Sequence, residues 1–247
     1  MKQKIAISLD ESLLKLVDSK VDGSIIRSRS QAIEYYLNKG IKEASVTTAI
    51  ILLKAAYHPK ALAVVKGKTV QRHQIDFLKS KGIKKILIVT QHSKLMNKLL
   101  EESHDKDIPV EILERKADTN MEALNLIRDN IEQENFLVLA GGIFVEFDLA
   151  NMVKKHLQHD KLVTMGLMVR QNPQNFGNVE MSGDLIVKFI EKPKNPVSNI
   201  VNAGFYIFKP ETFELFTKGS FERDLFPKLA KIKQLVGFFS YGEDIHL

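Results

Sequence analysis

The order of apolar and polar positions divides the chain into two parts. Residues 2–9, KQKIAISL, alternate strictly, which predicts one short half-buried strand. Two segments with helical periodicity follow, one starting after Asp10 and breaking at Asp22-Gly23, the other starting at Ser30 and ending at Gly40. The positions expected to face inward are Leu13, Leu14, Val17 and Val21 in the first helix and Ala32, Ile33, Tyr36 and Leu37 in the second. The first 44 residues are therefore predicted to form a small β-α-α module.

From Ser45 onward, short apolar runs alternate with amphipathic segments. The predicted strands are 49–53, 85–90, 110–113 and 136–140, and the predicted helices are 70–81, 94–102, 121–131 and 149–158. Strands that are apolar on both faces indicate an α/β fold with a parallel sheet covered by helices on both sides. After Leu162 the pattern changes to a hairpin around 182–184, a strand over 202–208, a helix from Pro210 and a last strand at VGFFSY. We therefore expect a Rossmann-like mixed or parallel sheet over residues 45–247.

Composition restricts the compartment more than the function. The chain has 247 residues, of which 44% are hydrophobic and 27% charged, as in ordinary globular proteins. The absence of cysteine excludes disulfides, thiolate chemistry and cysteine-based zinc sites. No apolar run reaches about 18 residues and the N-terminus is not a signal peptide, so we expect a cytoplasmic protein that spans no membrane. The net charge of +6 is compatible with an anionic partner without requiring one.

A lone strand followed by two helices cannot satisfy its own strand edges. The simplest solution is a homodimer in which the strands of two chains pair antiparallel. With RSRSQAI before the second helix, this arrangement resembles the ribbon-helix-helix family of DNA-binding regulators. The resemblance implies a double-stranded DNA partner, with the ribbon in the major groove and a phosphate at the start of the second helix. The implied DNA-binding residues are Lys2, Lys4, Ala6, Ser8, Arg27, Arg29 and Ser30. The alternative is a dimerisation strand with a helical hairpin that binds no DNA.

Three segments of the second part contain motifs in a characteristic order. They are PKALAVVKGKTVQRHQIDFLKSKGIKKILIVT, FLVLAGGIFVEFDL and FGNVEMSGDLIVKFIEKPKNPVSNIVNAGFYIF, and in the last EKP precedes NAG at a specific distance. Over most of residues 48–245 the chain thereby resembles the sugar-phosphate nucleotidyltransferases. These enzymes join a sugar 1-phosphate to a nucleoside triphosphate and release pyrophosphate.

Two departures from that family favour a loss of catalysis. The resemblance implies a glycine-rich loop that approaches the triphosphate with backbone N–H groups, but residues 54–58, KAAYH, contain neither glycine nor arginine. It also implies a metal-binding Asp after FLVLA, where this chain has Gly142, which offers Mg²⁺ no side-chain oxygen. For the second metal-binding Asp, the resemblance implies Asp244 in YGEDIHL. We therefore expect a pseudoenzyme without catalytic residues, metal or cofactor.

The sugar-binding segment, in contrast, is kept. The resemblance implies that Glu191 accepts hydrogen bonds from sugar hydroxyls and that Lys60 and Lys192 lie near phosphate. The complete set of implied ligand-binding residues is Lys60, Gly177, Glu191, Lys192, Asn202, Ala203 and Gly204. Taken singly, residues 191–193 are also compatible with a solvated turn, and residues 202–204 with the start of a strand.

Together these features predict a transcription regulator with two domains. Residues 1–44 would bind DNA and dimerise, and residues 45–247 would sense a sugar nucleotide or phosphosugar without catalysing its formation. The alternative is an active or repurposed sugar-phosphate nucleotidyltransferase that uses residues 1–44 only for dimerisation. A third possibility is an architectural DNA-binding protein whose large domain sets the geometry of the oligomer.

Overall fold

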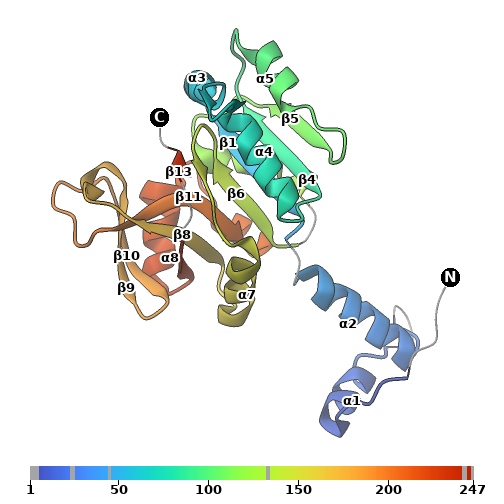
Figure 1. Cartoon of the computed structure of the whole chain (residues 1–247). Coiled ribbons are helices and arrows are strands. Elements are labelled where there is room, and N and C mark those ends of the chain that lie inside the picture. The colour runs from blue at the N-terminus through green and yellow to red at the C-terminus, as the bar shows by residue number, and fades with distance from the viewer. Residues whose placement is uncertain (1–5, 23–25, 44–45, 132–133, 241–243, 246–247) are drawn as a thin grey trace. The chain divides into compact units, whose positions relative to one another are not determined.

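The computed structural model describes the chain except for residues 1–5, 23–25, 44–45, 132–133, 241–243 and 246–247. The chain divides into two compact units, Met1–Ala44 and Ser45–Leu247 (Figure 1). The two units are described separately.

The first unit contains two helices, α1 (Glu11–Asp18) and α2 (Arg29–Glu43). Asp10 caps α1 as predicted, because its Oδ1 accepts the backbone N–H of Ser12 at 2.8 Å. The predicted strand is wrong over residues 6–9, which form no strand, while the rest of its range lies outside the described residues. A lone strand without a neighbour has no hydrogen-bond ladder to hold it.

The limits of α2 also differ from the prediction. The helix already begins at Arg29, and Ser28 rather than Ser30 provides the cap, since Ser28 Oγ accepts the backbone N–H of Gln31 at 3.2 Å. Gly40 does not end α2 but lies within it. A single glycine costs a helix only about 1 kcal/mol, so it does not by itself stop one.

The first unit leaves much apolar surface exposed. Among the positions expected to face inward, Ala32 is fully buried, whereas Leu13 is 46% and Leu37 52% exposed. The other exposed large apolar residues described in this unit are Ile7, Leu16, Tyr35 and Tyr36. Two short helices enclose too little volume to bury both apolar faces.

The second unit is built on a nine-stranded mixed sheet. Its first half is parallel, in the order β5 (Val110–Glu114), β4 (Lys85–Thr90), β1 (Thr48–Leu53) and β6 (Phe136–Ala140). These four strands match the predicted ranges to within one residue at either end. The sheet therefore confirms the predicted α/β class.

The second half of the sheet mixes strand directions. The order continues as β11 (Ile200–Phe208), β8 (Val163–Val169), β12 (Leu235–Phe239), β10 (Leu185–Glu191) and β9 (Gly177–Ser182). Strand β11 is antiparallel to β6 and β8, β12 is parallel to β8, and β9 and β10 form the predicted hairpin. One edge of the parallel half is thus joined, through β11, to a largely antiparallel half.

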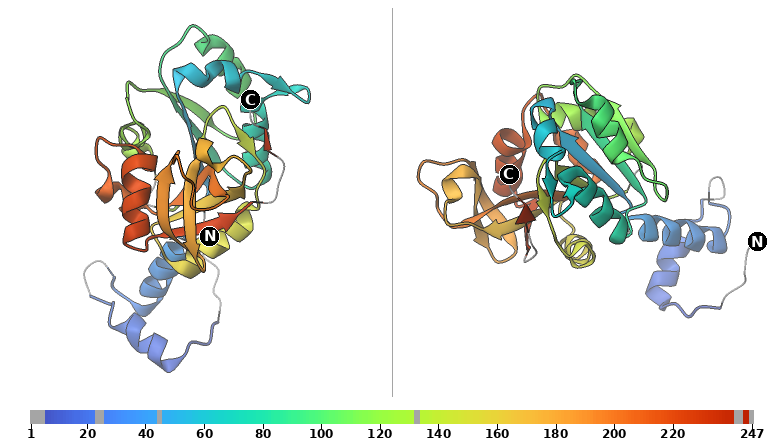
Figure 2. Two further views of the ribbon diagram at one scale, coloured as in Figure 1. Left: turned by 90° about the vertical axis from the view of Figure 1, so that its left-hand side faces the viewer. Right: turned by 45° about the horizontal axis from the view of Figure 1, so that its top comes forward.

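Helices cover both faces of this sheet (Figure 1 and Figure 2). One core cluster takes side chains from α4 (Val70–Ser80), α5 (Met96–Ser103) and α7 (Leu149–His159). The other takes them from α6 (Asn120–Asn125) and α8 (Phe226–Lys231). Because successive side chains of a strand point to opposite faces, Ile50 belongs to the second cluster and Ile51 to the first.

Several smaller elements complete the unit, and some differ from the prediction. The helix expected over 121–131 ends at Asn125 and is followed by a 3-10 turn, Arg128–Asn130. The segment from Pro210 is a 3-10 helix, Pro210–Leu215, and α8 with the preceding π-helical turn Phe221–Leu225 was not predicted. The remaining elements are a 3-10 turn Ala55–Tyr57, α3 (His58–Ala61), β2 (Val64–Val65), β3 (Lys68–Thr69), β7 (Phe144–Val145), a 3-10 turn Pro173–Asn175 and β13 (Asp244–Ile245). In the part of the chain that the structure describes, no helix is long and apolar enough to cross a bilayer.

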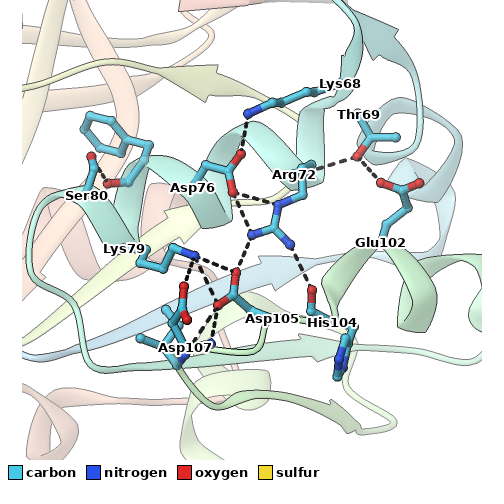
Figure 3. A network of polar contacts seen from close by, with 12 residues as sticks. Lys68, Thr69, Arg72, Asp76, Lys79, Ser80, Glu102, His104, Asp105 and Asp107 are labelled. Atoms are coloured by element: carbon cyan, nitrogen blue, oxygen red, sulfur yellow. Dashed lines mark hydrogen bonds and ion pairs between the residues drawn. The ribbon is translucent and has the colours of Figure 1, made fainter.

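A polar network fastens the loop after α5 to α4 (Figure 3). Asp105 accepts hydrogen bonds from Arg72 Nη2 at 2.6 Å, from Lys79 Nζ at 3.1 Å and from the backbone N–H of Asp107 at 2.9 Å. Burial opposes ionisation of the Asp105 carboxyl, but these donors outweigh it and hold its pKa well below the usual range. The network is structural and lies apart from the pocket described next.

Candidate active site

A pocket of 330 Å³ lies at the carboxyl ends of the central parallel strands. Its floor includes the last residues of β1, β4 and β6 together with Lys54, Gln91 and Gly141, which directly follow those strands. The residues 117–120, before and at the start of α6, also line it. Ligands of open α/β sheets bind at this edge, because the loops that follow parallel strands meet there.

Lys54, Gln91 and Arg115 form a row across three neighbouring strands. Leu53 pairs with Thr90 and Thr90 pairs with Glu114, so the residue that follows each of them leaves the sheet at the same level. The Gln91 side chain joins the row, since its Oε1 accepts the backbone N–H of Ala55 at 2.9 Å and its Nε2 donates to the Ala117 carbonyl at 2.8 Å. Lys54 and Arg115 are the lysine and arginine that line the pocket.

Carboxylates occupy another wall of the pocket. Glu191 ends β10 and Glu222 lies in the π-helical turn. Burial, and next the negative charge of Glu222, raise the pKa of Glu191. Tyr206 of β11 also lines the pocket, and its buried hydroxyl accepts a 2.7 Å hydrogen bond from Asn202 Nδ2. Burial raises the pKa of Tyr206, so the phenol stays protonated at neutral pH.

Asn120 connects the start of α6 with the π-helical turn. Its Nδ2 donates to Glu222 Oε1 at 3.0 Å and to Oε2 at 2.9 Å, and its Oδ1 accepts the backbone N–H of Phe221 at 2.8 Å. These contacts hold Glu222 in place although it lies on a turn rather than in the sheet. The pocket wall is therefore shaped by hydrogen bonds as well as by packing.

The connection that replaces the glycine-rich loop is short and firmly held. Residues 55–57 form the 3-10 turn and α3 follows without a gap. His58 is fully buried, with Nδ1 2.7 Å from Ser93 Oγ and Nε2 2.6 Å from Thr90 Oγ1. Burial lowers the pKa of His58 and keeps its ring neutral. His58 therefore fixes the connection after β1 to the end of β4 through hydrogen bonds.

Of the seven ligand-binding residues predicted from the sequence, Glu191 lines the pocket and the other six do not. Gly177 pairs with Glu191 across the hairpin, and a side chain at Gly177 would meet the Phe189 ring at 2.4 Å, so a glycine here leaves room for the ring. Lys192 is exposed. Lys60 is exposed as well, with Nζ 6.0 Å from the centre of the Tyr57 ring. The binding roles of these residues remain predictions.

Residues 202–204 lie at an irregularity of β11. The pairing register with β8 shifts between Asn202 and Tyr206. Asn202 uses its side chain within the protein, donating to the Tyr206 hydroxyl and accepting the backbone N–H of Gly204 at 2.9 Å. Ala203 is buried. Asn202 therefore helps to orient Tyr206, which lines the pocket.

One of the two positions at which the resemblance implies metal ligands, Gly142, lacks a ligand group for Mg²⁺. Gly142 provides no side-chain oxygen, and its φ of +79° is strained for any residue with a side chain. Asp244 lies in β13, where it pairs with Val145. Among the residues that the structure describes, no three or more His, Asp or Glu side chains gather as a metal site would require.

The residues predicted to bind DNA differ in their exposure and in their contacts. Ala6, Ser8 and Ser30 are exposed. The Arg29 guanidinium is bound by both carboxylate oxygens of Asp18, at 2.6 and 2.7 Å, instead of pointing freely to a phosphate. Arg27 is also exposed and has partners within the chain. Lys2 and Lys4 lie outside the described residues.

The pocket residues that were not predicted from the sequence include Lys54, Arg115, Asn120 and Glu222. A signal for the first two was present, because Lys54 directly follows the apolar strand predicted over 49–53 and Arg115 lies two residues after the strand predicted over 110–113. No local pattern marks Asn120 or Glu222, since their contact joins residues 102 positions apart.

With this geometry in place, the comparisons with known proteins identify the family. The model of the family described as "Nucleotidyl transferase" matches residues 52–235. The chain belongs to the nucleotidyl transferase family. The match spans the whole pocket, from β1 to β12, and lies entirely within the second unit.

Curated relatives support the same family. Mannose-1-phosphate guanylyltransferase catalytic subunit beta of Danio rerio is 29% identical over 188 residues, covering 72% of this chain and 52% of the relative. The protein of the same name from Drosophila pseudoobscura pseudoobscura is 30% identical over 186 residues, covering 72% of this chain and 50% of the relative. The chain thus spans about half the length of the curated relatives it matches.

Solved structures agree on the fold. HddC of Yersinia pseudotuberculosis has a TM-score of 0.69 at 18% identity, covering 81% of this chain and 93% of that one. A UDP-glucose pyrophosphorylase in complex with UDP-glucose has a TM-score of 0.68 at 14% identity, covering 81% and 92%. These likenesses confirm the nucleotidyltransferase-like architecture of the second unit.

The comparisons overturn the expectation of a DNA-binding regulator and that of a pseudoenzyme. The family and its relatives are named for enzymes, and none of these matches supports a DNA-binding role for residues 1–44. Gly142 and residues 54–58 do not by themselves establish a loss of catalysis. Those departures remove particular groups, whereas the pocket keeps charged side chains on more than one wall.

Proposed function

We propose that this chain is a sugar-phosphate nucleotidyltransferase. It would accept a nucleoside triphosphate and a sugar 1-phosphate in the pocket at the carboxyl ends of β1, β4 and β6. The observation that carries the proposal is this pocket, with Glu191 on its wall, within a chain of the nucleotidyl transferase family. The names of the curated relatives make mannose 1-phosphate and GTP the first pair to test.

The reaction transfers a nucleotidyl group between phosphates. A phosphate oxygen of the sugar 1-phosphate forms a bond to the α-phosphorus of the triphosphate, the bond from that phosphorus to the bridging oxygen breaks, and pyrophosphate leaves. Glu191 and Glu222 suit the sugar, because carboxylates accept hydrogen bonds from hydroxyl groups. We place this reaction in the cytoplasm, where nucleoside triphosphates are available.

The direct test is release of pyrophosphate by the purified chain. Mannose 1-phosphate is supplied with GTP and Mg²⁺, followed by other sugar 1-phosphates and triphosphates, and the reverse reaction is measured from the sugar nucleotide with pyrophosphate. We expect turnover with at least one pair, and a Glu191→Gln variant that raises KM for the sugar phosphate more than KM for the nucleotide. Absence of turnover in both directions by a folded protein would refute the proposal.

We further propose that residues 1–44 mediate homodimerisation. The exposed apolar side chains of this unit support the proposal, among them Leu13, Leu16 and Leu37. A second copy would bury such a surface, which monomers rarely expose in one stretch. Light scattering should give the mass of a dimer for the whole chain and of a monomer for Leu16→Glu. Leu100→Glu, which alters an exposed leucine of α5, is the matched control and should stay dimeric. A monomeric wild-type chain would contradict this proposal.

A further inference from the structure

The short connection after β1 cannot hold phosphate as a glycine-rich loop does. Such a loop binds through backbone N–H groups that are free to point at the ligand. Here the N–H of Ala55 donates to Gln91 Oε1, and the N–H of Tyr57 donates to the Lys54 carbonyl at 2.8 Å. Two backbone donors of this connection are therefore already used within the protein.

Lys54 and Arg115 supply positive charge at the same edge of the sheet. They follow β1 and β5, which flank β4, so their backbones are separated by about two strand spacings, or about 10 Å. Both side chains line the pocket. Arg115 uses Nη1 to bond the Glu114 carbonyl at 2.9 Å, which leaves other guanidinium donors for a ligand.

The charge of the pocket differs between its two sides. Lys54 and Arg115 belong to the parallel half of the sheet, whereas Glu191 and Glu222 come from β10 and the π-helical turn. A polyphosphate is attracted to the first pair and repelled by the second, so its place in the pocket is determined by charge. Asp118 is an exposed acid beside the cationic side and does not separate Lys54 from Arg115 along the row.

Gln91 keeps the two cationic positions at a constant separation. Its two hydrogen bonds join the segment after β1 to the segment after β5, on either side of its own strand. Because the backbone segments that carry the two cations are held in this way, less backbone entropy is lost when a ligand binds than with two free loops.

We propose that Lys54 and Arg115 are the phosphate-binding pair of this chain and that Gln91 is their positioning residue. The ligand class is the pyrophosphate portion of a nucleoside triphosphate, or free pyrophosphate. This inference rests on the proposed nucleotidyl transfer for its biological meaning, but the binding of pyrophosphate is measured without any turnover.

Inorganic pyrophosphate is the probe, titrated calorimetrically into the full-length protein. We expect Lys54→Gln and Arg115→Gln each to weaken the affinity about tenfold, because each removes one charge-assisted contact. Arg115→Lys should restore part of the affinity, since it keeps the charge but not the planar fork. Raising the salt concentration should weaken the wild type more than either variant.

Lys116→Gln is the matched control, since it removes an exposed positive charge next to Arg115 that does not line the pocket. It should bind pyrophosphate as the wild type does. We expect Gln91→Leu to bind pyrophosphate more weakly than the wild type. In the Gln91→Leu background, Arg115→Gln should then reduce the pyrophosphate affinity less than it does in the wild type. A purely structural role of Gln91 would not produce this second result. Thermal melting verifies that each variant is folded.

The outcomes separate this inference from the proposed function. Pyrophosphate binding that is lost in the Lys54 and Arg115 variants of a protein without turnover would support the inference while the nucleotidyltransferase proposal fails. Turnover with an unchanged KM for the triphosphate in both variants would overturn the inference and leave the enzyme standing. Equal weakening by Lys116→Gln would also overturn it, because nonspecific attraction would then suffice.

Discussion

The side-chain amide of Asn120 bonds both carboxylate oxygens of Glu222, which lies 102 residues further along the chain. The same asparagine accepts the backbone N–H of Phe221, so one side chain fixes a pocket carboxylate and its backbone. Because the π-helical turn packs outside the sheet, this contact links the start of α6 to the wall of the pocket that carries Glu222. The relationship makes a specific prediction.

Asn120→Asp should destabilise the protein although it changes few atoms. The new carboxylate faces Glu222 without a donor, and we expect a loss of about 2 kcal/mol in the free energy of unfolding, measured with urea. An acidic residue at the start of a helix normally stabilises the helix, so a decrease in the free energy of unfolding would point to the contact with Glu222. Asn125→Asp, at an exposed position of the same helix, should change stability little. Equal stability of the two variants would contradict the role of the contact.

Glu191→Gln should raise stability at neutral pH while it weakens substrate binding. Burial and the charge of Glu222 raise the pKa of Glu191 in the folded state, so the folded protein holds its proton to a higher pH than the unfolded chain. The ionised carboxylate is thus a cost to stability above its folded pKa, and this cost disappears as the pH falls through the unfolded value. Between pH 8 and pH 4, the variant should melt at a higher temperature than the wild type at neutral pH and at the same temperature in acid. A constant difference would disprove the assignment.

His156 should make the protein sensitive to acid. It is fully buried, its Nδ1 lies 2.8 Å from Thr164 Oγ1, and its Nε2 has no hydrogen-bond partner among the residues that the structure describes. Burial, and next the charge of Lys209, lower the pKa of His156 to about 4. An unfolded histidine has a pKa near 6.5, so stability should fall by roughly 3 kcal/mol between about pH 6.5 and pH 4.

A double variant isolates this effect. His156→Leu with Thr164→Val removes both polar partners from the core, which avoids leaving an unpaired hydroxyl. Urea unfolding at several pH values should show a shallower loss of stability in acid for the double variant. His92→Leu, at an exposed histidine, should keep the wild-type profile. Parallel profiles for all three proteins would exclude His156 as the cause.

Asp105→Asn should loosen the loop after α5. The carboxylate is nearly buried and is the common acceptor for Arg72 and Lys79 (Figure 3). We expect a loss of about 2 kcal/mol, because the amide NH2 of Asn would face the Arg72 and Lys79 donors at a buried position where the carboxylate accepted from them. Asp107→Asn alters an exposed partner of Lys79 and should change the free energy of unfolding little, because exposed ion pairs are screened by solvent. Hydrogen exchange of residues 103–108 would report whether the loosening is local.

The strands of the parallel half could be read from the sequence with little error. Segments such as KILIVT and FLVLA are short, apolar on both faces and bounded by polar residues, so one conformation satisfies every local preference. The first unit was less predictable. Its expected strand depended on a second chain, and its second helix continues through Gly40 because a single glycine is a weak stop.

The candidate active site was also only partly predictable from the sequence. Glu191 could be recognised from its motif, and Lys54 and Arg115 follow strands that the hydrophobic pattern predicts. The function could not be inferred from the missing glycine-rich loop and the missing Asp at Gly142. Such a departure shows which group is absent at one position, but it does not show which groups other positions provide. That inference was wrong for the regulator and the pseudoenzyme, and the family comparison corrected it.

The sequence by itself determined the α/β class, the order of the strands along the chain and the motif that carries Glu191, because local periodicity and turn residues encode these directly. Only the tertiary structure decided that Lys54, Gln91 and Arg115 stand in one row and that Asn120 holds Glu222. These relationships depend on strand order and register between distant segments. Sheet pairing and packing set them, and no local pattern contains them.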